Sequence, residues 1–209
     1  MPDNDEILIE NQSFPLISWT KYLFSKKHII FLLCEEYRKM SFRNRFVISG
    51  SNGPINISVP LINGRDQKVP FKDVRICYRE KWQLRHWRTI TSCYSRSPYF
   101  EYYRNEFEKF FKNTWEFLFD WNLAALNWLK EVLIFPGELI VTTQLPGWDV
   151  EDARDKWLPK NFQRVDIGFQ YSQVFQEKIG FQNNLSILDL LFNKGPQAKD
   201  LLIESCLHE

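Results

Sequence analysis

The chain has few of the residues that build metal centres and disulfide frameworks. Its four cysteines, Cys34, Cys77, Cys93 and Cys206, form no Cys-x-x-Cys pair, and its three histidines are scattered along the sequence. Metal sites need ligands at characteristic spacings, so we expect no bound metal. Unpaired cysteines are typical of proteins that keep their thiols reduced, and we therefore predict a cytoplasmic location.

The chain also lacks a long apolar run, a strong net charge and a glycine-rich nucleotide loop. Its longest apolar run, residues 29–34, is too short to cross a bilayer, and its acidic N-terminus differs from a secretory signal. A net charge of +1 produces no overall field that would attract nucleic acid. Neither of the standard phosphate-binding loop motifs occurs. We expect no integral membrane segment, no nucleic-acid partner and no cofactor.

What the chain does have is length and aromatic side chains. With 209 residues, 18 Phe and 8 Trp, it can bury a hydrophobic core without disulfides, and it fits one domain over residues 1–209. The predicted elements begin in the order strand, helix, strand, which favours an α/β or α+β fold. We expect a single domain with a mixed β-sheet, a β-hairpin and packed helices.

Apolar spacing and turn signals place the individual elements. Strands are expected at residues 6–10, 29–33, 46–49, 55–59 and 139–143, with a short strand at 74–77 and an extended segment at 170–175. Helices are expected at residues 16–27, 81–95, 100–119, 122–133 and 186–193. Gly50-Ser-Asn-Gly53 is the predicted hairpin turn, and residues 144–166 are expected to be irregular. Ser186 and Asp189 form a partial capping box for the last helix, and Gly195 follows its end.

The helix predicted at residues 81–95 carries the strongest candidate for acid–base chemistry. His86 shares a helical face with Trp82, and Arg85 and Arg88 flank it. Neighbouring guanidinium groups lower the pKa of an imidazole and keep it neutral, which suits a catalytic base acting on an anionic substrate. The structural alternative is a half-buried histidine that bonds to a backbone carbonyl.

Two other groups of polar residues are candidates for substrate binding. Asn44 and Arg45 end a basic segment before the hairpin, where loop side chains can grip phosphate; a solvated basic loop is the alternative. The second group lies in an otherwise apolar C-terminal region and consists of Tyr171, Gln173, Asp189 and Asn193. Helix capping by Asp189 and Asn193 is the alternative for this group.

Five blocks of the sequence, taken in order, carry a family resemblance. They are Phe42-Arg-Asn-Arg45, Ile57-Ser-Val-Pro-Leu61, Trp82 with His86 and Ile90, Tyr94 with Ser97-Pro-Tyr-Phe100, and Ser186-Ile-Leu-Asp-Leu-Leu-Phe-Asn-Lys-Gly195. Together they resemble the WbqC-like proteins. The resemblance implies work on an activated or lipid-linked sugar in bacterial O-antigen and envelope-polysaccharide biosynthesis. At the level of reaction class it implies an acyl- or aminoacyl-type transfer to an aminosugar.

The chain departs from this family in two places. Family members carry a Gln-Pro-x-Tyr/His-Pro-like segment after the first strand, and Asn11-Gln-Ser-Phe-Pro15 retains only part of it. Residues 144–168 are short and charged where many members have a longer piece rich in serine and glycine. The substrate can differ accordingly.

Two functions are therefore open at this point. A transferase predicts that Arg45, Arg85, Arg88 and His86 converge on one cleft. A non-catalytic module that binds a sugar nucleotide, or a partner in an envelope-biosynthesis assembly, predicts an exposed aromatic patch without such convergence.

Overall fold

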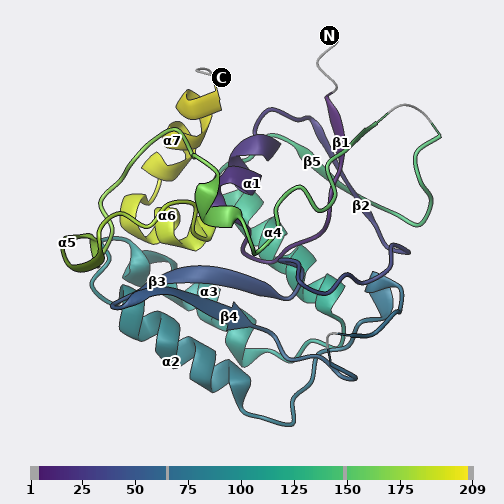
Figure 1. Ribbon diagram of the computed structural model, residues 1–209, viewed down its shortest axis with the longest axis horizontal. Helices are drawn as coiled ribbons and strands as arrows, with labels where there is room; N and C mark the ends of the chain where they lie inside the picture. The colour runs from purple at the N-terminus through teal and green to yellow at the C-terminus, as the bar shows by residue number, and fades with distance from the viewer. Residues whose placement is uncertain (1–4, 65, 148–149, 207–209) are drawn as a thin grey trace.

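The structure is a computed structural model that describes residues 5–64, 66–147 and 150–206. Its strands are β1 (Glu6–Leu8), β2 (His28–Leu32), β3 (Arg45–Gly50), β4 (Gly53–Ser58), β5 (Glu138–Thr142) and β6 (Glu151–Asp152). Its α-helices are α1 (Ile17–Leu23), α2 (Trp82–Tyr94), α3 (Phe100–Lys112), α4 (Leu118–Val132), α5 (Gln176–Ile179), α6 (Ile187–Lys194) and α7 (Gln197–Cys206). Short 3-10 turns cover Phe71–Asp73 and Phe162–Arg164. The predicted α/β fold class is confirmed (Figure 1).

A parallel sheet of four strands has the order β5-β2-β1-β6. Side chains alternate between its two faces, so Ile7 and Ile29 join the main core while Leu8 and Ile30 join a smaller apolar cluster. All four strands run in the same direction. Their C-terminal ends therefore meet along one edge of the sheet, which we call the carboxyl edge.

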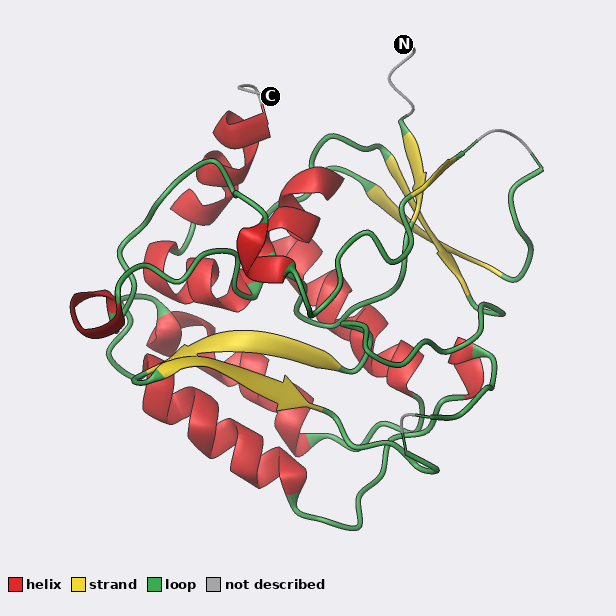
Figure 2. Cartoon of the chain, viewed as in Figure 1, coloured by secondary structure: helices red, strands yellow, loops and turns green. Residues whose placement is uncertain are grey.

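The antiparallel strands β3 and β4 form a hairpin that lies apart from the parallel sheet (Figure 2). Gly50 pairs with Gly53 across the predicted turn. Gly53 has a φ of +123°, a backbone conformation that residues other than glycine rarely adopt. The hairpin and its turn are therefore where the sequence places them.

Phe14 joins the segment after β1 to the rest of the core. Its ring makes edge-on contacts, with centroid separations of 5.1 to 5.6 Å, to Phe46, Phe107, Phe110 and Trp121. These rings come from the hairpin, α3 and α4. The contacts bury residues 10–16 and hold the end of β1 in a fixed place.

The C-terminal helix α6 is buried as predicted. Leu188, Leu191 and Phe192 have no exposed surface, and the Ser186 side chain caps the helix by accepting from the Leu188 amide at 3.3 Å. The capping-box role of Asp189 is wrong, because the Ser186 amide donates to the carbonyl of Val47 instead. The Asp189 carboxylate is therefore available for other partners.

The predicted helix at residues 100–119 is wrong in extent, because α3 ends at Lys112 and α4 begins at Leu118. Between them the chain is extended beside residues 74–76. The Ile76 amide donates to the carbonyl of Glu116 at 3.0 Å, and the Leu118 amide donates to that of Val74 at 2.8 Å. This non-local pairing replaces helical hydrogen bonds, and it leaves residues 74–77 in isolated bridges rather than in a strand.

The sequence-based prediction missed helix α7. It also missed the two-residue strand β6, which lies within the charged segment 144–166. Residues 170–175 belong to no strand in the described chain. Across residues 5–64, 66–147 and 150–206, no helix is both long and apolar enough to span a membrane.

Candidate functional site

Three neighbouring strands deliver acidic residues to the carboxyl edge. Glu10 lies two residues after β1, Glu35 lies three residues after β2, and Asp155 lies three residues after β6. In open α/β sheets the crevice outside the carboxyl ends of the strands is where ligands bind. The carboxyl edge is therefore where this fold favours a ligand site.

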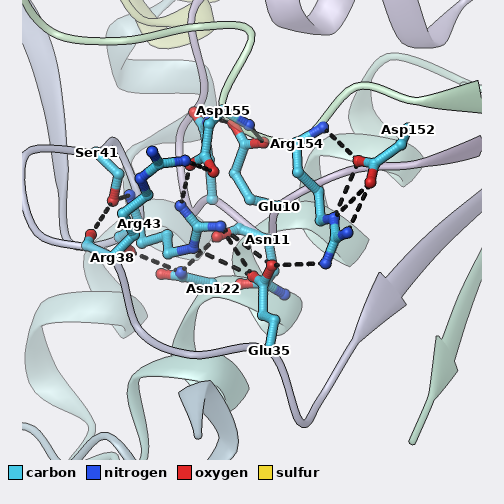
Figure 3. Close-up of polar contacts among 11 residues, drawn as sticks. Glu10, Asn11, Glu35, Arg38, Ser41, Arg43, Asn122, Asp152, Arg154 and Asp155 are labelled. Atoms are coloured by element: carbon cyan, nitrogen blue, oxygen red, sulfur yellow. Dashed lines mark hydrogen bonds and ion pairs between the residues drawn. The ribbon is translucent and has the colours of Figure 1, made fainter. Parts of the chain in front are cut away.

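Arg43 joins two of these strand ends, those of β2 and β6, through its buried guanidinium group (Figure 3). Its Nε and Nη2 atoms donate to the two carboxylate oxygens of Glu35, each at 3.1 Å, and its Nη1 donates to Asp155 at 2.8 Å. Arg43 has only 1% of its surface exposed. This bidentate geometry fixes the loop after β2 against the turn after β6.

Two further arginines extend the ion-pair network toward solvent. Arg38 donates to the second oxygen of Asp155, and Arg154 donates to Asp152 through Nε at 3.0 Å and Nη2 at 2.6 Å. Arg154 also lies 3.9 Å from Glu35. Asp155 itself has a φ of +61°, a left-handed backbone conformation that costs energy in a residue other than glycine. Its amide donates to Glu10 at 2.9 Å, which holds it there.

A cavity of about 700 Å³ opens over this network. Its carboxyl groups are those of Glu35, Glu36, Asp152 and Asp155. Its guanidinium groups are those of Arg38, Arg43 and Arg154, and Tyr37 completes the lining. We call this cavity the carboxyl-edge pocket. Carboxylates accept hydrogen bonds and guanidinium groups donate them, so the pocket suits a strongly polar ligand.

Glu10 lies behind the pocket and is almost completely buried. Burial raises its pKa from 4.5 to about 7, against the opposing attraction of Arg43 and the hydrogen bonds from Asp155 and Gln12. Burial would likewise raise the pKa of Asp155, but Arg43 and Arg38 outweigh it and hold that pKa below its usual value. At neutral pH one carboxyl group of the cluster can therefore hold a proton while its neighbour is ionised, which is the arrangement that acid–base chemistry uses.

Several buried polar atoms next to this cluster have no hydrogen-bond partner. The side-chain amide of Asn11, 1% exposed, has neither its nitrogen nor its oxygen paired. The side-chain oxygens of Gln12 and Asn122 are also unpaired. Asn122 donates from its nitrogen to the carbonyls of Asn11 and Arg43, at 3.2 and 2.8 Å, so it lies directly behind the pocket wall.

His86 lies on α2, half-buried against the ring of Trp82 at a centroid separation of 5.3 Å. Burial, and secondarily the charge of Arg85, lower its pKa from 6.5 to about 4, so the imidazole is neutral at physiological pH. Its buried Nδ1 has no hydrogen-bond partner. The nearest groove on α2, of about 380 Å³, is lined by Gln83, Leu84 and Trp87, among others, and His86 does not line it.

The substrate-binding residues predicted on α2 and at the start of the hairpin lie in several places. Arg85 is exposed and pairs with Glu80 at 2.8 Å, and Arg88 is exposed on the same helix. Arg45 begins β3 opposite Ser58, and the Asn44 side chain donates to the carbonyl of Val59 at 3.0 Å. None of these four residues lines the carboxyl-edge pocket.

The C-terminal polar residues do come together, in a closed network. The buried carboxylate of Asp189 accepts from Tyr94 at 2.6 Å, from Tyr171 at 2.7 Å and from Gln173 at 2.9 Å. The Asn193 amide donates to the Asp189 carbonyl at 2.7 Å. Burial raises the pKa of Asp189 despite these three donors. The network ties α2 and α6 to residues 171–173, and this tie accounts for its polar groups.

The sequence-based interpretation did not include Glu10, Glu35 or Asp155 among the site residues, and it treated Arg43 as part of a basic run. One signal was present: Glu10 ends the first predicted strand, and Glu35 follows the second predicted strand by two positions. Among the described residues, no cluster of three His, Cys, Asp or Glu side chains is arranged to hold a metal ion.

Comparison with known proteins identifies a family. The model of the WbqC-like protein family matches residues 11–160 and 149–201, which together include the whole carboxyl-edge pocket. No curated protein and no solved structure matches the chain.

Proposed function

Because this chain belongs to the WbqC-like protein family, we propose that it is a cytoplasmic transferase-type enzyme acting on an activated or lipid-linked sugar in bacterial envelope-polysaccharide biosynthesis. The carboxyl-edge pocket is the observation that supports an active site, and it is where we place the sugar. It lies at the edge where α/β sheets bind their ligands, and its volume of about 700 Å³ is in the range of small-molecule sites.

The chemistry of the pocket fits a sugar. Each sugar hydroxyl both donates and accepts hydrogen bonds, and the pocket offers ionised acceptors beside ionised donors, as in Asp152 next to Arg154. Ion pairs hold these groups in place before a ligand arrives. Such preorganisation lowers the entropy lost on binding.

Glu10 and Asp155 support a role in proton transfer. Transfer of a group to a hydroxyl or an amine requires a base to accept the proton of the attacking atom. Asp155 lines the pocket and is ionised, and its amide contacts the carboxyl group of Glu10. We propose Asp155 as the group facing the substrate and Glu10 as the residue that positions it.

The experiment compares two arginines that each pair with one acidic residue. Arg154 lines the carboxyl-edge pocket and pairs with Asp152, whereas Arg85 lies on α2 and pairs with Glu80. Each is changed to Met, and untargeted mass spectrometry identifies the metabolites that co-purify with each protein. We expect wild type and Arg85→Met to retain a sugar nucleotide or lipid-linked sugar, and Arg154→Met to lose it.

Two outcomes would contradict the proposal. Loss of the ligand from Arg85→Met alone would place the substrate at the site expected from sequence, on α2. Retention of a sugar ligand without any turnover of it would favour the alternative, a non-catalytic sugar-binding module.

A further inference from the structure

Helix α2 carries a basic outer face that the carboxyl-edge pocket does not use. The helix lies on the outside of the molecule, against the hairpin (Figure 1). Its residues 82–94 include no aspartate or glutamate, and Glu80 is the one acidic residue between positions 74 and 100. The exposed cations of the helix and its flanks are Arg79, Lys81, Arg85, Arg88 and Arg96. We call this surface the basic face of α2.

The basic face is an extended row of charges. Lys81, Arg85 and Arg88 follow one another at spacings of four and three residues, which places them on one side of a helix. Residues 81–94 rise by about 20 Å along the helix axis, and Arg96 lies just beyond the C-terminal end of α2. A row of this length exceeds a single phosphate group and matches an extended anionic surface.

The cations of the basic face also differ from those of the neighbouring helix in their partners. On α3, each lysine and arginine pairs with an acidic residue three or four positions away. On the basic face Arg85 pairs with Glu80, but Lys81, Arg88 and Arg96 have no ion pair in the part of the chain that the structure describes. The solvated face of α3 is therefore balanced within its own helix, whereas the basic face can bind anions from outside.

An exposed leucine lies within the basic face. Leu84 is 46% exposed and lies one helical turn before Arg88. The half-buried Trp87 lines the same groove of about 380 Å³ as Leu84. The headgroup region of a bilayer accommodates apolar and indole side chains between cationic ones. The sugar–phosphate backbone of a nucleic acid offers no comparable apolar layer.

The charge of the whole molecule favours a planar partner. The net charge is only +1, so acidic residues elsewhere balance the excess on α2. A planar anionic surface meets one face of the protein, and charges farther away than about 8 Å are largely screened at physiological salt. Nucleic-acid-binding domains, by contrast, commonly carry a large overall positive charge.

We propose that the basic face of α2 is a peripheral docking surface for the anionic headgroups of a phospholipid membrane. Its guanidinium groups bind lipid phosphates, for which their planar pairs of donors are suited, and Leu84 enters the headgroup layer. This inference goes beyond the proposed function, because it does not depend on whether the carboxyl-edge pocket holds a sugar.

The test measures co-sedimentation of the full chain with lipid vesicles. One set of vesicles contains phosphatidylcholine alone, and the other contains phosphatidylcholine and phosphatidylglycerol in equal amounts. We expect binding to the anionic vesicles and not to the neutral ones, and we expect added salt to weaken it.

Four variants locate the effect. Lys81→Gln and Arg88→Gln should each weaken binding to the anionic vesicles by about fivefold, the effect of one cation close to an anionic leaflet. Leu84→Ala should weaken it by about fivefold through the loss of apolar contact with lipid. Lys109→Gln is the matched control, because it removes the same charge from an exposed position on α3 and should leave binding unchanged.

Four outcomes would overturn the inference. The first is equal binding to the two kinds of vesicle, and the second is binding to neither. The third is an equal loss in Arg88→Gln and Lys109→Gln, which would show that overall charge and not the basic face controls binding. The fourth is tighter binding to duplex DNA than to anionic vesicles at the same salt, with the same dependence on Arg88 but none on Leu84. That result would assign the basic face to nucleic acid.

The vesicles carry no sugar, so none of these outcomes decides the sugar-binding function proposed above. That function is tested separately, by the metabolites that co-purify with the protein.

Discussion

Glu10 shows how a single buried residue couples this fold to pH. Its pKa rises from 4.5 to about 7, with burial as the largest cause, so the folded protein holds a proton that the unfolded chain releases over this interval. A carboxyl group with a raised pKa contributes most to stability below the unfolded value, and the contribution is lost as pH rises through the folded value. Glu10 therefore lowers the free energy of unfolding as pH rises from about 4.5 to about 7.

The first prediction follows from that sign. Glu10→Gln removes the ionisable group, so the variant should lose about 3 kcal/mol less stability than wild type between pH 4.5 and pH 8. Urea unfolding at a series of pH values measures this difference in slope. Identical slopes in the two proteins would show that Glu10 titrates normally in the folded state.

His86 is the residue for which sequence and structure lead to different experiments. We expect His86→Ala to leave sugar binding unchanged, because His86 does not line the carboxyl-edge pocket. Its role as the catalytic base stays a prediction. Loss of sugar modification with binding and folding intact would establish that role, and unchanged turnover would refute it. A base with a pKa of about 4 would also sustain activity down to that pH.

At the scale of elements, local signals and long-range pairing compete. The helical pattern of residues 100–119 is real in the sequence, yet residues 113–117 pair with residues 74–78, and the helix stops. By contrast, α6 has a local Ser186 cap and a glycine at the C-cap with a φ of +55°. Tertiary pairing does not oppose these local signals, so the helix forms where the pattern predicts it.

The prediction at this scale concerns α6. Leu191 has no exposed surface, so Leu191→Ala should lower the free energy of unfolding by about 2–5 kcal/mol. Leu84→Ala, on the exposed side of α2, is the matched control and should change it by about 0.5 kcal/mol or less. Denaturant unfolding measures both, and a near-zero loss for Leu191→Ala would show that α6 is peripheral.

For the whole molecule, Arg43 is the point at which distant segments are joined. Its guanidinium connects Glu35 after β2 to Asp155 after β6, while its backbone carbonyl accepts from Asn122 of α4. Arg43 lies just before β3, outside the parallel sheet, and it links the segments that meet at the carboxyl edge. Removal of the Arg43 guanidinium would leave the carboxylates of Glu35 and Asp155 close together without the positive charge between them.

Two arginines that share Asp155 test this role. Arg43→Met should lower the free energy of unfolding by about 3–5 kcal/mol, because it leaves buried carboxylates unpaired. Arg38→Met removes an exposed partner of the same carboxylate and should cost about 1 kcal/mol or less. Urea unfolding measures both losses. We attribute the larger loss to the burial of Arg43, so an equal loss of unfolding free energy in the two variants would contradict this explanation.

The sequence by itself determined the features that depend on neighbouring residues. Period and turn chemistry fix the hairpin around Gly50 and Gly53 and the span of α2, because hydrogen bonds between near neighbours form them. The ordered family blocks also identified the family, since such blocks need no tertiary information.

Only the tertiary structure decided where the chemistry gathers. Glu10 and Asp155 are 145 residues apart, and they meet because β6 adds beside β1 while β2 pairs on its other side. The sequence groups Tyr171, Gln173 and Asp189 as polar candidates for substrate binding, but only packing shows that they bond to one another inside the core. Strand order and burial depend on contacts between distant residues, and no local pattern encodes them.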